Sequence, residues 1–259
     1  MTPENRPAHI LILGGTADAR RLAALIKDQI GPGVQLTTSL AGRTKRPTDL
    51  AGDVRVGGFG GAGGLADYLR AENVTCLIDA THPFAAAISA HAASAANQTA
   101  IPRLTIVRPR WQIPDSLHVQ RVANMAEAAA ALDAPAAKRV LLTTGIQNLD
   151  VFSHLTDIFF LIRLIETPEK PPLANHARIV IQKPPFTPEG ERRLMTENRI
   201  DTLITKESGG SATEAKLLVA DALGIRVILI ERPSAPEGAS VASPEQALSW
   251  LQARLGRST

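Results

Sequence analysis

Cysteine is almost absent from this chain of 259 residues, and so are long hydrophobic runs. The single cysteine, Cys76, excludes disulfides and clusters of thiolate metal ligands. It lies in the strand-like run Thr75-Cys76-Leu77-Ile78, where we expect a buried, inert thiol. No apolar run approaches the ~20 residues that span a bilayer, and the first five residues do not form a signal peptide. These absences predict a cytoplasmic protein with no membrane contact.

Aromatic residues are also scarce, at 3% of the chain, and the net charge is only +3. The basic residues are dispersed, whereas nucleic-acid-binding proteins more often show a concentrated basic face or stacking aromatics, so no nucleic-acid partner is predicted. Mild basicity suits a small polyanionic ligand. The single tyrosine, Tyr68, is followed four residues later by Glu72 rather than lysine, which disfavours a short-chain dehydrogenase. The histidines lack metal-ligand spacing, so no metal site is predicted.

What the sequence does contain is a repeated alternation of buried strands and amphipathic helices. Such continuous apolar strands with helices between them indicate parallel sheets covered on both faces. In the first half we predict strands at 9–13, 34–39, 54–57, 75–80 and 101–107, with helices at 17–30, 65–73 and 84–97. In the second half we predict strands at 140–142, 158–165, 178–181, 202–205 and 227–230, with helices at 124–132, 187–198, 211–223 and from 243.

A proline-rich stretch at 109–114 interrupts this pattern and marks a domain boundary. The expected fold class is therefore α/β, with two Rossmann-like domains at 1–109 and 110–259 whose sheets are mainly parallel. The final helix, 243–255, is expected to pack on either domain. Asn124 with Glu127, and Ser211 with Glu214, have the spacing of capping boxes at helix starts.

The most informative segment is 10–20, which predicts a buried strand, a glycine turn and a helix N-terminus. Free backbone N–H groups and the positive end of the helix dipole suit a phosphate at such a turn. The segment departs from the G-x-G-x-x-G fingerprint, because Thr16 occupies the second glycine position and Ala19 the third. We expect Thr16 to cap the helix and to donate its hydroxyl to phosphate. A tight turn without a ligand is the alternative.

The strand at 34–39 lacks an acidic residue at its end and runs into Ala41-Gly42-Arg43-Thr44. An NAD site usually places Asp or Glu there to bind the ribose 2′-hydroxyl, whereas an arginine suits a 2′-phosphate. The first domain is therefore predicted to bind NADP(H) rather than NAD(H).

Two further strand ends in the first half carry candidate ligand contacts. Six glycines fall within 57–64 and permit close backbone approach to a ligand, although a floppy loop would show the same pattern. The next strand ends in Asp79-Ala80-Thr81-His82-Pro83. We expect Thr81 and His82 near the ribose or the reacting edge of a substrate, with His82 as a proton donor. Alternatively, Thr81 caps the next helix and His82 only bonds to backbone.

In the second half, Thr143-Thr144-Gly145 and the run 206–210, Lys-Glu-Ser-Gly-Gly, each follow a predicted strand. Backbone N–H groups, hydroxyls and a lysine at these positions suit the carboxylates of an acidic substrate. Ordinary strand-to-helix turns with a solvated lysine are the alternative.

Taken together, these motifs resemble those of the precorrin-6A reductase family of cobalamin biosynthesis, which has a cobalt-precorrin counterpart. The resemblance runs from about residue 9 to Pro233, and the segment 79–85, Asp-Ala-Thr-His-Pro-Phe-Ala, is its most specific part. It implies an NADPH-dependent oxidoreductase that reduces a double bond of a tetrapyrrole macrocycle to give precorrin-6B, with the active site in a cleft between two domains. Whether the substrate contains cobalt, and whether neighbouring pathway enzymes bind transiently, stays open.

On this basis each candidate residue has an expected role. The expected cofactor-binding residues are Gly14, Gly15, Thr16, Arg20, Ser39, Gly42, Arg43, Thr44, Gly57, Gly58 and Thr81. The expected substrate-binding residues are Thr144, Gly145, Lys206, Ser208, Gly209 and Gly210. His82 and Lys206 are the expected catalytic residues, as proton donors. Two alternatives are a non-enzymatic NADPH-binding tetrapyrrole carrier and an NADP-dependent reductase of another small acidic substrate.

Overall fold

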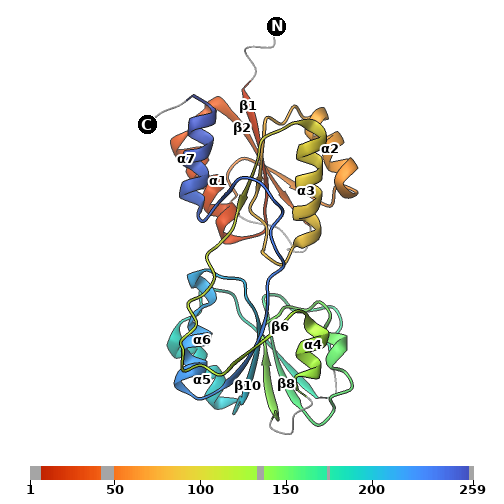
Figure 1. Cartoon of the computed structure of the whole chain (residues 1–259), viewed down its shortest axis with the longest axis vertical. Coiled ribbons are helices and arrows are strands. Elements are labelled where there is room, and N and C mark those ends of the chain that lie inside the picture. The colour runs from red at the N-terminus through yellow and green to blue at the C-terminus, as the bar shows by residue number, and fades with distance from the viewer. Residues whose placement is uncertain (1–6, 42–49, 133–136, 174–175, 257–259) are drawn as a thin grey trace. The chain divides into compact units, whose positions relative to one another are not determined.

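The computed structural model describes residues 7–41, 50–132, 137–173 and 176–256. The chain forms two compact units: the first comprises Met1–Arg108 together with Pro233–Thr259, and the second comprises Pro109–Arg232. Each unit is built on one six-stranded sheet with helices on both faces (Figure 1). The predicted class of two α/β domains with parallel sheets is confirmed.

The sheet of the first unit has the strand order β3-β2-β1-β4-β5-β12, and every neighbouring pair is parallel. This is the order of a dinucleotide-binding sheet, in which connections leave β1 toward one side and β4 toward the other. The central strand β1 is apolar except for His9 and is buried from His9 to its end, as such a layered sheet requires. The strands are β1 (Ala8–Leu13), β2 (Val34–Leu40), β3 (Asp53–Val56), β4 (Cys76–Asp79), β5 (Arg103–Ile106) and β12 (Ser240–Val241).

Two pairs of helices cover the faces of this sheet (Figure 1). Helices α1 and α7 pack against each other on one face, where Leu22, Ile26 and Leu251 join one buried core. Helices α2 and α3 pair on the other face, where Leu65 and Leu69 join a second core. The helices are α1 (Ala17–Gln29), α2 (Gly61–Ala71), α3 (Ala86–Thr99) and α7 (Pro244–Arg254), with a 3-10 turn, η2 (Gly31–Gly33), after α1.

The sheet of the second unit has the order β9-β8-β7-β10-β11-β6, again with all neighbouring pairs parallel. Its strands are β6 (Val119–Val122), β7 (Arg139–Leu142), β8 (Phe159–Leu164), β9 (Ala177–Ile181), β10 (Thr202–Lys206) and β11 (Arg226–Ile230). Helices α5 (Pro188–Glu197) and α6 (Ala215–Ala222) cover one face, while α4 (Met125–Ala130) packs near the 3-10 turn η3 (Leu149–Phe152). A further 3-10 turn, η4 (Ser211–Thr213), precedes α6.

The two sheets share one strand order, although the chain enters them at different points. In the first unit the edge strand β12 and its helix α7 come last, whereas in the second unit the corresponding β6 and α4 come first. The turn between edge strand and helix has the same hydrogen bond in both units. The Gln246 side chain accepts a hydrogen bond from the Ala242 N–H, and the Glu127 carboxylate accepts one from the Ala123 N–H, each at 2.8 Å. The N-cap side chains of Asn124 and Ser243 in turn accept from the Glu127 and Gln246 N–H groups, so each helix start has a capping box whose return bond reaches the residue before the N-cap.

The structure divides the chain differently from the sequence-based domains 1–109 and 110–259. The break near residue 109 is matched, but Pro233–Thr259 groups with the first unit rather than the second. The final helix, which the sequence left open, packs on α1 through Ala247, Leu248 and Leu251. Edge strands β6 and β12 were not predicted, because both are short and each buries little of its surface.

Two predicted helix starts are wrong: α2 begins at Gly61, inside the glycine run, rather than at 65, and α6 begins later than predicted. Ser211 and Glu214 do not form a capping box: Ser211 begins the turn η4, its carbonyl accepts from the Glu214 N–H at 3.3 Å, and α6 starts only at Ala215. The reason is the pair of glycines before Ser211, whose positive φ values of +67° and +79° turn the chain before it can enter a helix. The capping box of Asn124 and Glu127 is confirmed.

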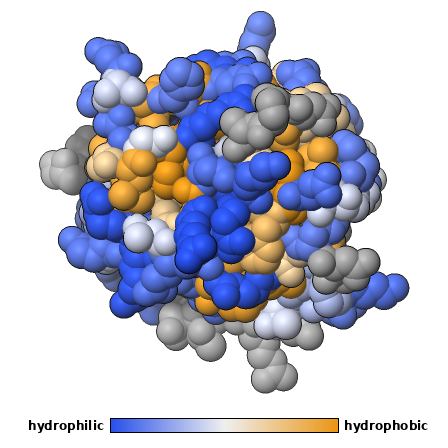
Figure 2. Space-filling view, turned by 90° about the horizontal axis from the view of Figure 1, so that it is seen from below, coloured by the Kyte–Doolittle hydropathy of each residue, from blue (hydrophilic) through white to orange (hydrophobic). Residues whose placement is uncertain are grey.

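Exposed large hydrophobic side chains are scattered over both units. They are Val54, Val56, Ile146, Ile165, Ile181, Leu218 and Leu223. Figure 2 shows one face on which hydrophobic patches are separated by hydrophilic residues, the ordinary mixture of a protein surface. Within the described ranges, no helix is both long enough and apolar enough to cross a membrane.

If α7 completes the core of the first unit, removing a side chain that it buries will destabilise that unit. Leu251 is fully buried, so Leu251→Ala should lower the free energy of unfolding by about 2–5 kcal/mol. Leu218→Ala, at a side chain 51% exposed, should change it by less than about 0.5 kcal/mol. Urea unfolding followed by Trp250 fluorescence, in a common Trp111→Phe background, measures both. Equal effects of the two variants would contradict the packing of α7.

Candidate active site

The turn after β1 has the shape of a phosphate-binding turn. Gly14 must lack a side chain, because a Cβ there would lie 2.8 Å from the Thr38 methyl group and 3.4 Å from Ala19. Gly15 has a φ of +97°, which favours glycine, and the space beside its Cα is open. The first N–H groups of α1 precede the first intrahelical donor, Arg20, and so have no partner within the helix. The close packing at Gly14 and the open backbone at Gly15 fit a bound pyrophosphate.

Thr16 caps α1 as predicted, but its hydroxyl is not available to donate to a phosphate. The hydroxyl accepts a hydrogen bond from the Ala19 N–H at 3.1 Å and donates its own proton to the Ala80 carbonyl at 2.7 Å. This second bond ties the end of β1 to the end of β4. Only the backbone N–H of Thr16 is therefore left to bind a phosphate.

Charges at the start of α1 are balanced within the first unit. Asp18 lies in the first turn of the helix, where a carboxylate is favourable for the helix dipole but repels a phosphate. The Arg108 guanidinium pairs with it at 2.5 Å and offsets that repulsion. Arg20, another expected cofactor contact, is exposed on the next turn.

The ends of β2 and β3 lie side by side and hold the next group of expected residues. Ser39 is opposite Arg55 in the strand register, and the Arg55 guanidinium donates toward the Ser39 hydroxyl at 3.4 Å. The same guanidinium donates to the carbonyls of Gly57 and Gly58 at 2.5 and 2.8 Å, so it fixes the start of the glycine loop. Gly42, Arg43 and Thr44, the expected 2′-phosphate contacts, lie outside the described residues.

The loop after β4 is organised by a buried carboxylate. Asp79 is 1% exposed, and its Oδ1 accepts from both the N–H and the hydroxyl of Thr81, at 3.1 and 2.7 Å. Its Oδ2 has no hydrogen-bond partner among the described residues. A buried oxygen without a hydrogen bond is unfavourable unless a donor reaches it. A ligand bound between the ends of β1 and β4 could supply that donor.

His82 is exposed in the same loop, and α3 begins only at Ala86. The Phe84 N–H donates to His82 Nδ1 at 3.2 Å, which places the proton of the neutral imidazole on Nε2. Thr81 is not the cap of α3, because the capping position is Ala85. The structure thus brings Gly14, Gly15, Thr16, Thr81 and His82 to one edge of the first sheet.

The turn after β7 in the second unit differs from its counterpart after β1. No α-helix follows it: the chain passes through Gly145, at a φ of +80°, into the short 3-10 turn η3. This turn therefore lacks the dipole of a long helix that a phosphate site uses. Thr144 is 5% exposed, and its hydroxyl has no hydrogen-bond partner among the described residues.

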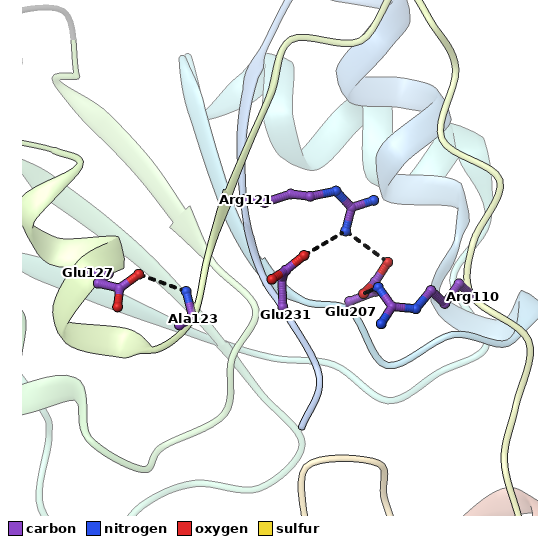
Figure 3. A network of polar contacts seen from close by, with 6 residues as sticks. All are labelled: Arg110, Arg121, Ala123, Glu127, Glu207 and Glu231. Atoms are coloured by element: carbon purple, nitrogen blue, oxygen red, sulfur yellow. Dashed lines mark hydrogen bonds and ion pairs between the residues drawn. The ribbon is translucent and has the colours of Figure 1, made fainter. Parts of the chain in front are cut away.

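The segment after β10 contains a buried carboxylate that sequence reasoning missed (Figure 3). Glu207 is fully buried, and its two oxygens receive Arg110 at 2.8 Å and Arg121 at 3.2 Å. Arg121 also contacts Glu231 at 3.5 Å. Both arginine side chains are about half exposed, 55% and 43%, so one buried anion presents two guanidinium groups at the surface. The sequence signal that could have revealed it is the position of Glu207 directly after a buried strand, because a carboxylate buried there needs cationic partners.

The other expected substrate contacts lie beside this network. Lys206 ends β10, and the Ser208 N–H donates to its carbonyl at 2.8 Å. Gly209 and Gly210 follow in the left-handed region, and the Gly210 carbonyl accepts from the Trp111 indole at 2.8 Å. Within the second unit the structure thus places Lys206–Gly210 near Arg110, at the carboxyl ends of the strands.

A second buried ionic cluster lies deeper in the second unit, under α5 and α6. Lys216, on α6, is 3% exposed and lies 4.7 Å from the Trp111 ring centre. Its pKa is lowered to about 7, mainly by burial and also by the nearby Arg163, while Glu191 opposes the change. Arg163 and Glu191 pair at 2.7 Å and are both buried. In the sequence Lys216 looks like an ordinary solvated lysine at a helix start.

Within the described residues, no group of three or more histidine, cysteine, aspartate or glutamate side chains is arranged to hold a metal ion. Cys76 is buried and its pKa is raised to about 12 by that burial, which agrees with an inert thiol.

A sheet of dinucleotide-binding order with an open glycine turn defines the first unit as a dinucleotide-binding α/β domain. Residues 9–252 match the family model described as Precorrin-6x reductase CbiJ/CobK. The chain belongs to this family, as its motifs predicted.

Individual relatives match along almost their whole length. The precorrin-6A reductase of Rhodococcus erythropolis is 45% identical over 93% of this chain and 96% of its own. The cobalt-precorrin-6A reductase of Priestia megaterium is 29% identical over 93% of this chain and 97% of its own. A solved structure, CobK precorrin-6A reductase, superposes with a TM-score of 0.88 at 40% identity and covers 97% of this chain and 98% of that one. The fold and the enzyme class are therefore established.

The buried lysine leads to a prediction for pH dependence. The unfolded chain holds the Lys216 proton up to its ordinary pKa of 10.5, whereas the folded chain releases it near pH 7. The resulting destabilisation is fully present below pH 7 and disappears as the pH rises from 7 toward 10.5. Lys216→Met should therefore raise the free energy of unfolding by up to about 4 kcal/mol at pH 6, and less as the pH increases.

The measurement is urea unfolding of wild type and variant at several pH values between 6 and 10. Lys27→Met, at an exposed lysine on α1, is the matched control and should show no such pH-dependent gap. A constant difference between Lys216→Met and wild type across this range would show that Lys216 stays charged when folded.

Proposed function

We propose that this protein catalyses the NADPH-dependent reduction of one macrocycle double bond in precorrin-6A, giving precorrin-6B in cobalamin biosynthesis. The observation that carries the proposal is the 45% identity to a precorrin-6A reductase over nearly the full length of both chains. Relatives named cobalt-precorrin-6A reductase are only 29–32% identical. This difference supports a metal-free rather than a cobalt-containing substrate.

The first unit would hold the cofactor. The Gly14-Gly15 turn and the first N–H groups of α1 fit the pyrophosphate, because a Cβ at Gly15 would meet no atom within 4 Å. Ser39 and the Gly57–Gly58 backbone would border the adenosine end, and Thr81 the nicotinamide end. When bound, NADPH supplies a hydride to the substrate. The chain's own task is to fix the distance and orientation between donor and acceptor carbons.

The second unit would hold the tetrapyrrole, whose side chains carry several carboxylates. Arg110 and Arg121 are already oriented by Glu207, so little side-chain entropy is lost when a carboxylate binds their outer faces. Lys206, Ser208 and the backbone of Gly209 and Gly210 lie beside them, and Thr144 with Gly145 borders the neighbouring strand end. Apart from Lys206, these residues would orient the macrocycle rather than take part in the reduction.

Reduction of the double bond needs a proton as well as a hydride. We assign the donor to His82 or Lys206, the two expected catalytic residues. His82 would donate from its imidazolium form, in which Nδ1 also carries a proton, so the bond from the Phe84 N–H to Nδ1 has to break before His82 can act as the acid.

The test is anaerobic incubation with precorrin-6A and either NADPH or NADH, following the absorbance of the nicotinamide and of the macrocycle together. We expect stoichiometric consumption of both with NADPH and much slower reaction with NADH. Tight binding of precorrin-6A without oxidation of NADPH would contradict the proposal and indicate a carrier. Reaction only with the cobalt-containing substrate would overturn the choice of a metal-free one.

His82→Ala should lower kcat by about 100-fold or more if Nε2 donates the proton. The KM for NADPH should stay within about twofold, because the imidazole gives its proton to the substrate and not to the cofactor. Steady-state kinetics measure both, and His154→Ala, at an exposed histidine of the second unit, is the control. An unchanged kcat in His82→Ala would reassign the donor to Lys206 or water.

A further inference from the structure

Arg55 is a partly buried cation at the carboxyl end of the first sheet, and it has no carboxylate partner among the described residues. Its guanidinium carbon lies 3.9 Å from the ring centre of Phe59 and 5.2 Å from that of Tyr68, so the group is stacked and held in place. Its hydrogen-bond acceptors are the Ser39 hydroxyl and two carbonyls of the glycine loop, all of them neutral. Within the described part of the chain it joins no ion pair.

Arg55 lies beside the strand end that borders the cofactor ribose in a dinucleotide-binding sheet. Ser39 is next to the last residue of β2, the strand whose end borders the ribose 2′-position in a dinucleotide-binding sheet. The Ser39 carbonyl accepts from the Gly14 N–H at 2.9 Å, so this strand end is bonded directly to the phosphate turn. An NAD site would place an acidic side chain here, and the structure places a guanidinium beside the Ser39 hydroxyl instead.

The unused donors of Arg55 suit a phosphate. A guanidinium has five N–H donors, and three of them serve Ser39, Gly57 and Gly58. Two remain for an incoming anion. A positive charge that is partly desolvated and has only neutral partners binds an anion more strongly than a solvated one does.

We propose that Arg55 is a specificity-determining residue that binds the 2′-phosphate of NADPH beside Ser39. The inference rests on the proposed function, since it concerns the same cofactor. Arg55 also bonds to the Gly57 and Gly58 carbonyls and so fixes the start of the glycine loop beside Ser39. The competing explanation is that Arg55 only clamps this loop and contacts no cofactor.

Calorimetric titration with adenosine 2′,5′-bisphosphate and with 5′-AMP tests the proposal, because the two probes differ only in the 2′-phosphate. Wild type should prefer the bisphosphate. Arg55→Gln, whose amide can still donate to the loop carbonyls, should lose about 10–100-fold of affinity for the bisphosphate and little for 5′-AMP. Arg55→Lys, which keeps the charge but not the planar contacts, should retain most of the preference.

Arg70→Gln is the matched control, because Arg70 is an exposed arginine of the same unit that pairs with Asp67 on α2. Thermal unfolding of every variant verifies that the first unit is folded. An equal loss of affinity for both probes in Arg55→Gln, or an unchanged preference, would overturn the proposal and leave the NADPH assignment intact. Equal binding of both probes by wild type would instead count against NADPH itself, and against Arg55 with it.

Discussion

The proposed cofactor site depends on the hydrogen bond from the Thr16 hydroxyl to the Ala80 carbonyl. It joins the ends of β1 and β4, the two strands from which the chain departs in opposite directions across the sheet. A ligand crevice forms at such a point because no connection covers it. The bond adds to the backbone bond from the Ala80 N–H to the Leu13 carbonyl, and the small Gly14 and Ala19 let α1 approach closely enough for Thr16 to reach. A glycine at position 16 would remove both this bond and the side-chain cap of α1.

The core of this fold was predictable because its strands are apolar and its turns are rich in glycine. The central strands, the Thr16 cap and the parallel sheets followed from local pattern alone. Strands β6 and β12 did not, since each becomes a strand only by pairing with a distant part of the chain. The roles of Arg55 and Lys216 were equally hidden, because a guanidinium stacked on Phe59 and an ammonium beside Trp111 are products of tertiary packing. Sequence patterns report burial of apolar side chains far better than burial of charges.

Under the proposed function, the two units use one sheet order for different ligands. The first keeps a long helix after its central strand and so concentrates backbone N–H groups on one point. The second replaces that helix with a short 3-10 turn and places a buried glutamate after β10, which orders two arginines. Backbone donors suit a compact diphosphate, whereas separate guanidinium groups suit carboxylates spread around a large ring. The division of labour follows from where each sheet puts its positive charge.

The position of β12 and α7 at the end of the chain has a consequence for biosynthesis. During translation the second unit leaves the ribosome as one uninterrupted stretch, while the first still lacks its edge strand and the helix that covers α1. The unit that begins the chain is thus the last that can be completed. Until then the apolar side of α1, including Leu22 and Ile26, has no partner helix and is a natural target for chaperones. A premature stop near the C-terminus would damage the N-terminal unit while leaving the second intact.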